Sequence, residues 1–238
     1  MNRPYTVCHM SSSLNGKIHG PWMGVDEAHP LHEAYEKTNG SYQPDAWTGG
    51  RVTTEGAFTN HHKPELEANS EKYSREDYVA VSDSDMYYVS IDTSGRVGWQ
   101  SNTVQYQDRA PAHVIEILSN KVSDEYIAYL RKYNISYIFA GEDKLDGKLA
   151  LEKLYNLFGI KTLMISGGGY SNYSFLNEDL IDEISITMAP IVEGETNKNT
   201  SFEKADYLPE HSPVAFDLKD VDKLAGGVLW IRYTRKNN

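Results

Sequence analysis

KTLMISGGGYSNYSFLNEDLIDEISITMAPIVEG, residues Lys161–Gly194, is the stretch that decides the fold. An apolar run at Thr162–Ile165 predicts a short strand that ends at three consecutive glycines, and a helix-like stretch and a second apolar run at Ile184–Ala189 follow. Because glycine has no Cβ, the triplet lets backbone amides approach a ligand, and the free amides of a helix start favour a phosphate. The alternative is a tight turn between strand and helix that binds nothing.

Alternating elements surround this stretch. Strands are expected at Tyr5–Ser11, Met86–Asp92, Ala112–Leu118 and Ile135–Ala140. Helices are expected at Ala28–Thr38, at Ser123–Tyr133 with Ser123 as N-cap, and after Asp146 up to Gly159. Residues 59–78 are the most polar segment, which predicts an exposed excursion with a partial helix.

The C-terminus carries a hairpin pattern. Pro213–Val221 and Gly227–Arg235 alternate apolar and polar residues around a glycine turn, which predicts two antiparallel strands. Strands linked by helices and followed by a hairpin indicate an α/β fold, with one mixed sheet and helices on both faces. We expect a single domain over residues 1–238.

Composition excludes several classes of protein. A net charge of −11 argues against nucleic acid or an anionic membrane as the main partner. The single cysteine, Cys8, excludes an intramolecular disulfide and a multi-cysteine zinc site. The sequence shows neither the apolar core of a signal peptide nor an apolar run of about 18 residues, so a cytoplasmic location is expected.

Other ligand-binding patterns fit poorly. A dinucleotide fingerprint of the Rossmann type needs a glycine where this chain has Asn172. Adjacent His61 and His62 point to opposite sides of an extended chain and have no obvious third ligand, so we expect no metal there. The H-x-E and P-C-x-x-C motifs of zinc deaminases are absent.

Three stretches carry a resemblance to a known family. They are R-P-Y through S-L-N-G-K-I at Arg3–Ile18, D-A-W through G-R-V-T at Asp45–Thr53, and the glycine stretch up to A-P-I-V-E-G at Ala189–Gly194. In this order they resemble the reductase domain of riboflavin biosynthesis, the C-terminal half of the bacterial bifunctional deaminase-reductase. That domain belongs to the dihydrofolate-reductase-like superfamily. The resemblance implies a three-layer sandwich with a mixed, mostly parallel sheet and a C-terminal antiparallel hairpin.

The resemblance also implies NADPH as cofactor. The implied cofactor-binding residues are Ser11, Ile18, Gly50, Arg51, Thr53, Gly167, Gly168, Gly169 and Tyr170. Backbone groups of Ser11 and Ile18 would contact the nicotinamide carboxamide. The Arg51 guanidinium would favour NADPH over NADH, because the 2′-phosphate adds about two negative charges. The alternative for Arg51 is a solvated loop arginine.

The resemblance places Asn15, Lys17 and Ser166 at the reaction centre, facing the substrate. The family more commonly has Asp at position 15 and Glu at position 166, so two carboxylates are missing here. Lys17 could instead be a surface lysine, and Ser11–Ser13 a polar strand end.

The implied activity is hydride transfer to the ribose C1′ of a phosphorylated ribosylaminopyrimidine, which opens the sugar. Two alternatives stay open: reduction of a pterin or another heterocyclic C=N bond, and a nucleotide-binding module that has lost catalysis. The family resemblance and the apolar alternation of the C-terminal strands also predict a homodimer. That alternation is carried by Val214, Phe216, Leu218, Val228, Trp230 and Tyr233.

Overall fold

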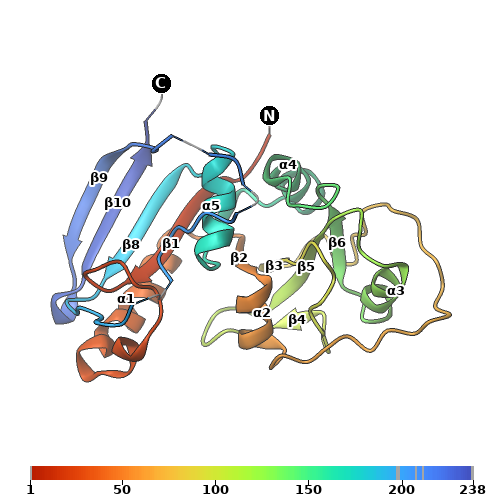
Figure 1. Cartoon of the computed structure of the whole chain (residues 1–238), viewed down its shortest axis with the longest axis horizontal. Helices are drawn as coiled ribbons and strands as arrows, with labels where there is room; N and C mark the ends of the chain where they lie inside the picture. The colour runs from red at the N-terminus through yellow and green to blue at the C-terminus, as the bar shows by residue number, and fades with distance from the viewer. Residues whose placement is uncertain (1, 197–198, 207, 211, 237–238) are drawn as a thin grey trace. The chain divides into compact units, whose positions relative to one another are not determined.

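A computed structural model describes residues 2–196, 199–206, 208–210 and 212–236. The chain divides into two compact units (Figure 1). Unit 1 consists of Met1–Pro4 and Asp45–Leu163, and unit 2 consists of Tyr5–Pro44 and Met164–Asn238. Strand β7 (Thr162–Ile165) lies where the chain returns from unit 1 to unit 2. The prediction of one domain over 1–238 stays a prediction.

Unit 1 contains a mostly parallel sheet. Its strands are β2 (Ala46–Gly50), β3 (Tyr87–Ile91), β4 (Thr103–Val104), β5 (Ala112–Leu118) and β6 (Ser136–Phe139). β3 pairs in parallel with β2 and β5, β6 pairs in parallel with β5, and the short β4 is antiparallel to β5. The helices are α2 (Arg51–Phe58), α3 (Asp124–Lys132) and α4 (Gly147–Phe158). α2 packs on β2 and β3, whereas α3 and α4 pack on β6.

Local capping explains the bounds of the helices in unit 1. The Ser123 hydroxyl accepts a hydrogen bond from the Tyr126 amide at 3.2 Å, which satisfies an unpaired donor at the start of α3. Asp146 does the same for α4 through the Leu149 amide at 2.9 Å. Gly159 ends α4 with φ 68°, a left-handed conformation that glycine adopts without strain. All three sequence predictions are confirmed.

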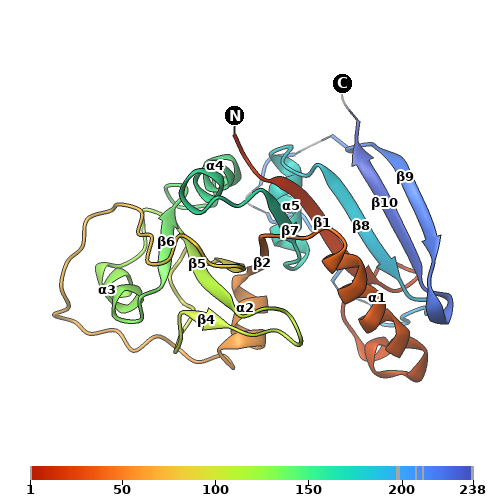
Figure 2. The same ribbon diagram turned by 180° about the vertical axis from the view of Figure 1, so that it is seen from behind.

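Unit 2 contains a sheet of mixed direction. β1 (Tyr5–Ser12) runs parallel to β8 (Glu183–Met188), and β8, β10 (Leu229–Arg235) and β9 (Phe216–Lys223) follow in antiparallel order. Helices α1 (His29–Gly40) and α5 (Gly169–Asn177) lie on opposite faces of this sheet (Figures 1 and 2). Three short 3-10 helices complete the unit: η1 (Pro21–Gly24), η2 (Asp26–Ala28) and η3 (Ala225–Gly227).

A small apolar cluster holds the first connection of unit 2 in place. It consists of Trp22, Ala28, Leu31, Ala34, Ala189 and Val228, all of them buried. Residues from η1, η2 and α1 therefore pack against the ends of β8 and β10, which fixes the chain on both sides of the 3-10 helices.

The predicted α/β fold, with a mixed and mostly parallel arrangement and a C-terminal hairpin, is confirmed. One local prediction was wrong. Residues 59–78 contain no helix, because polar side chains there leave no apolar face to pack. The predicted hairpin strands, Pro213–Val221 and Gly227–Arg235, correspond to β9 and β10, and β9 is exposed along most of its length, with Leu218 59% exposed.

A buried carboxyl group lies in the sheet of unit 1. Glu116 on β5 is fully buried and accepts a hydrogen bond from the Trp99 indole, while its second oxygen has no partner among the described residues. Burial, and secondarily the charge of buried Asp92, raises the pKa of Glu116 well above its ordinary value. Glu116 is therefore a neutral acid over part of the pH range in which an exposed glutamate is charged.

This raised pKa predicts how stability depends on pH. The folded pKa of Glu116 lies above its unfolded value of about 4.3, so its contribution is fully present below about pH 4.3 and is lost as pH rises through the folded pKa. Glu116→Gln keeps the acceptor for Trp99 but cannot titrate. We expect its free energy of unfolding to gain on the wild type as pH rises from about 4 to about 8 in urea titrations. Parallel curves for the two proteins would contradict the assignment, and exposed Glu152→Gln is the control.

Candidate active site

The glycine triplet joins a strand to a helix start, as the sequence predicts. β7 ends at Ile165, Ser166 and Gly167 form the turn, and α5 begins at Gly169. Gly168 is the N-cap residue of α5, and no side chain caps the helix. The first amides of this helix therefore keep the partial positive charge that suits an anion.

Gly168 and Gly169 differ in the space that a side chain would have at each position. A Cβ on Gly169 would lie 2.5 Å from the carbonyl oxygen of Thr200 and 2.9 Å from Cγ of Glu203. A Cβ on Gly168 would meet nothing within 4 Å. Packing against Thr200 and Glu203 thus requires a glycine at position 169. At Gly168 there is open space where a side chain would begin.

Residues 199–205 form a strap over the start of α5. The Glu203 amide donates to the Gly169 carbonyl at 3.0 Å, and the Asn172 side chain donates to the Ser201 carbonyl at 2.8 Å. The glycines permit another segment to come close to their backbone, and part of that close contact is therefore made by residues 199–205 of the chain itself.

Gly169→Ala and Gly168→Ala form a matched pair of variants. We expect Gly169→Ala to lose about 1–3 kcal/mol of unfolding free energy, because the added methyl group overlaps the Thr200 carbonyl. Gly168→Ala should lose less than about 1 kcal/mol, the difference between the two residues at an N-cap. Urea unfolding of both proteins measures the two losses, and equal losses would contradict the packing argument.

Two hydroxyl groups near the glycine turn are unpaired. The Oγ atoms of Ser166 and Ser171 are shielded from solvent and have no hydrogen-bond partner within the described part of the chain. Ser171 is the third residue of α5 and Ser166 precedes the glycine triplet, so both residues lie within three positions of Gly168 in the sequence. Buried polar groups without partners are uncommon in native proteins, and unpaired hydroxyls at a helix start suit an anionic ligand.

Lys17 and Asn15 belong to a tight turn after β1. Gly16 has φ 79°, and its amide donates to the Ser13 carbonyl at 3.0 Å. The Ser13 amide donates to the Lys17 carbonyl at 2.9 Å, which closes the turn and leaves the Lys17 side chain half-buried.

The structure places the predicted nicotinamide contacts beside this turn. Ser11 lies on β1 opposite Thr187 of β8 and is half-buried. The Ile18 amide donates to the Asn199 carbonyl at 3.0 Å, so a ligand cannot use it while this bond is made. Tyr170, at the second position of α5, is 54% exposed.

Unit 1 contains another helix start, that of α2. Gly50 is the N-cap of α2, Arg51 is its first residue and exposed Thr53 its third. The sequence analysis predicted no helix here. The one local signal was the Arg51–Glu55 spacing of four residues, a favourable pair on a helix surface.

Glu55 organises the basic groups at α2. It is 4% exposed, and its carboxylate pairs with Arg51 at 2.8 Å and with Lys63 at 3.2 Å. Burial acts to raise the pKa of Glu55, but the Lys63 hydrogen bond and the Arg51 charge outweigh it and hold that pKa below its ordinary value. The Arg51 guanidinium is thereby oriented along α2 with its side chain still 31% exposed.

The preceding glycine has a packing role that sequence reasoning did not find. A Cβ on Gly49 would lie 2.1 Å from the hydroxyl oxygen of Tyr88. That hydroxyl also makes a 2.7 Å hydrogen bond with Thr54, which holds α2 on β3.

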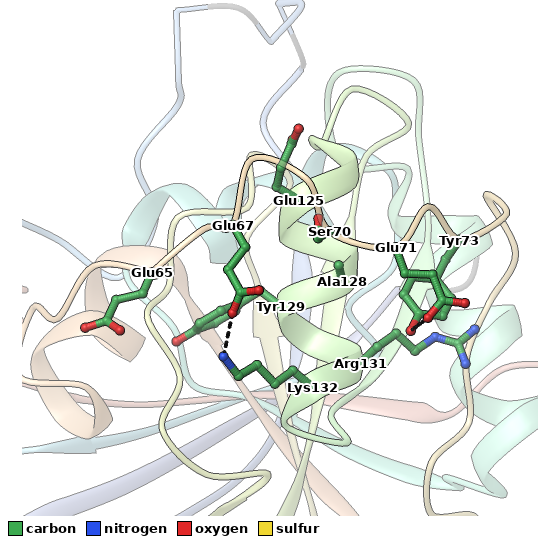
Figure 3. Close-up of a pocket in the computed structure, with 10 residues that line it drawn as sticks. All are labelled: Glu65, Glu67, Ser70, Glu71, Tyr73, Glu125, Ala128, Tyr129, Arg131 and Lys132. Atoms are coloured by element: carbon green, nitrogen blue, oxygen red, sulfur yellow. Dashed lines mark hydrogen bonds and ion pairs between the residues drawn. The ribbon is translucent and has the colours of Figure 1, made fainter.

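A cavity of about 230 Å³ lies elsewhere in unit 1, between α3 and the polar excursion (Figure 3). Its lining includes four glutamates, and Glu67 pairs there with Lys132 at 2.8 Å. None of the predicted site residues lines it. Among the described residues no group of three or more His, Cys, Asp or Glu could hold a metal ion, and no helix is long and apolar enough to cross a membrane.

Comparison with known proteins identifies the family. The profile of the RibD C-terminal domain matches residues 51–230, which is most of the chain. The chain belongs to the RibD C-terminal domain family. Over 129 residues it is 38% identical to the 2,5-diamino-6-ribosylamino-4(3H)-pyrimidinone 5′-phosphate reductase of Methanothermobacter thermautotrophicus. That match covers 54% of this chain and 57% of the relative, so it spans little more than half of either protein.

Solved structures of other proteins share the fold. A pyrimidine reductase-like protein from Corynebacterium diphtheriae superposes with a TM-score of 0.67 at 15% identity, covering 99% of this chain and 93% of its own. RibD from Acinetobacter baumannii gives 0.63 at 18% identity, covering 99% of this chain and 59% of its own. The resemblance drawn from the three motifs is thus confirmed for the family and the fold, and the archaeal relative is named as a pyrimidinone phosphate reductase.

Proposed function

We propose that this chain is an NADPH-dependent reductase of a ribosylaminopyrimidinone 5′-phosphate. The match to the archaeal pyrimidinone phosphate reductase carries the proposal. In the proposed reaction C1′ of the ribose accepts a hydride and its bond to the ring oxygen breaks. The ring oxygen takes a proton, which leaves an open ribityl chain.

The residues present fit a dinucleotide phosphate as cofactor. In unit 2 the open space at Gly168, the unpaired hydroxyl of Ser171 and the uncapped start of α5 suit a pyrophosphate. In unit 1 Arg51 and Thr53, at the start of α2, suit the 2′-phosphate that distinguishes NADPH from NADH. Gly50, Gly167, Gly169, Tyr170, Ser11 and Ile18 complete the proposed set. When bound, NADPH would supply the hydride.

The substrate groups are proposed around the turn after β1. Lys17 would bind a substrate oxygen or phosphate through its ammonium group. Ser166 offers a neutral hydroxyl where relatives more commonly carry a carboxylate, so this chain would orient the substrate with neutral groups and one fixed charge. The protein's own contribution is then to hold two ligands in a reactive geometry.

Steady-state oxidation of NADPH across a small substrate panel tests the proposal. The panel contains the ribosylaminopyrimidinone 5′-phosphate, its dephosphorylated form and a dihydropterin. We expect turnover with the phosphorylated pyrimidinone, and much less without the phosphate. Turnover of the pterin alone would favour reduction of a heterocyclic C=N bond. Binding of NADPH without turnover of any compound would indicate a nucleotide-binding module.

We also propose a homodimer built in part from β9 and β10. β9 is an edge strand with Leu218 59% and Val221 46% exposed, and the residues of β10 are only half-buried. Such a surface is suited to cover an identical one. Sedimentation at micromolar concentration should give about twice the 26.9 kDa chain mass. A species of single chain mass at high micromolar concentration would contradict the dimer.

A further inference from the structure

The side chain of Asn15 is bound to the backbone of Glu193. Its Nδ2 donates to the Glu193 carbonyl at 2.7 Å, and its Oδ1 accepts from the Glu193 amide at 3.0 Å. The side-chain amide of Asn15 thus bonds to both the N–H and the C=O of one residue, as a directly opposed residue of an antiparallel strand does. The residue as a whole is solvent-exposed, yet both polar ends of its side chain are engaged.

The same side chain also organises its own turn. The Ser13 hydroxyl donates to Asn15 Oδ1 at 2.9 Å and accepts from the Lys17 amide at 3.0 Å. A continuous set of hydrogen bonds therefore runs from the backbone of Glu193 through Asn15 and Ser13 to the backbone of Lys17. The Leu14 amide adds a parallel bond to the Ile191 carbonyl at 2.7 Å.

Glu193 is itself held firmly. It is 8% exposed, and its carboxylate accepts from the Trp22 amide at 3.3 Å and from the Glu195 amide at 3.0 Å. A Cβ on Gly20 would lie 2.6 Å from Oε2 of Glu193, so η1 packs closely on this carboxylate. The anchor for Asn15 is thus a buried residue fixed by two backbone amides.

We propose that Asn15 is a positioning residue, which clamps the turn 13–17 to Glu193 and so fixes Lys17 for the substrate. This inference rests on the proposed reductase function for its catalytic consequence, and on the contacts alone for the clamp. It differs from the expectation that Asn15 faces the substrate.

The clamp gives a physical reason for an amide at position 15, where the resembled family more commonly has aspartate. The Glu193 backbone presents one acceptor and one donor, and only an amide offers the matching donor and acceptor. An ionised aspartate is an acceptor only. It would accept from the Glu193 amide but place a negative oxygen against the Glu193 carbonyl.

The variant Asn15→Asp distinguishes a substrate-facing role of Asn15 from its role as a clamp on Glu193. If Asn15 faced the substrate, aspartate would restore the family's charge and turnover would hold or rise. The clamp predicts the reverse: kcat falls about tenfold in Asn15→Asp and in Asn15→Ala, while the Kd for NADPH changes less than about twofold. Exposed Asn69→Asp adds the same charge in unit 1 and is the matched control.

Hydrogen exchange of the Glu193 amide tests the clamp without any substrate. We expect exchange to rise about tenfold or more in Asn15→Ala, which lacks the acceptor for this amide, and not in Asn69→Asp. Unchanged exchange in Asn15→Ala, or unchanged kcat in both Asn15 variants, would overturn the proposal. If the wild type reduces no pyrimidinone but exchange rises as expected, the reductase function fails and the clamp stands.

Discussion

Arg51→Ala is expected to weaken NADPH binding by roughly 10- to 100-fold and to leave NADH binding almost unchanged. Only NADPH carries the 2′-phosphate, and a hydrogen bond to a charged group contributes about 1.5–3 kcal/mol. Isothermal titration with both cofactors measures the difference. Equal losses for NADPH and NADH would remove Arg51 from the 2′-phosphate.

Two variants make this measurement specific. Arg51→Lys keeps the charge but loses the planar guanidinium, so we expect an intermediate loss. Arg96→Ala removes an exposed arginine of the same unit and should change neither affinity. Because Arg51 is paired with buried Glu55, unfolding should also be measured: the loss of one partially exposed ion pair is worth about 1 kcal/mol or less.

Most of the strands could be predicted because their side chains are buried in continuous runs. β5 is buried at every position and was predicted with its observed bounds, as was β7. The ends of α3 and α4 could also be predicted from the sequence, because Ser123, Asp146 and Gly159 bond to amides and carbonyls within a few residues of themselves.

Other features depend on residues far along the chain. α2 is short and mostly polar, and it is held by a bond from Thr54 to Tyr88 that no local pattern reveals. Gly169 is needed because Thr200 lies against it, not because of its own turn. The polar segment 59–78 lacks the apolar spacing that would support a helix, so its partial helix was wrong.

In the proposed site, too, some features follow from local sequence and others depend on contacts between distant residues. The glycine turn and the start of α5 were visible in the sequence because a strand, three glycines and a helix are contiguous. The pairing of Asn15 with Glu193 was not, since it joins positions that are distant in sequence through backbone atoms.

Lys17→Met tests the one fixed positive charge proposed to face the substrate. Methionine keeps most of the apolar stem and removes the ammonium group, so the turn should persist. The hydrogen bonds that shape this turn come from Ser13, Gly16 and the Lys17 backbone.

We expect kcat/KM to fall about 10- to 100-fold in Lys17→Met, the effect of one lost charge-assisted contact, while the Kd for NADPH changes little. Neutral Asn15 and Ser166 do not titrate, so the pH profile of turnover should show no acidic limb from either position. Exposed Lys37→Met, in the same unit, is the control and should keep wild-type kinetics. If Lys17→Met turns over like the wild type, Lys17 is a surface lysine and the substrate phosphate is bound elsewhere.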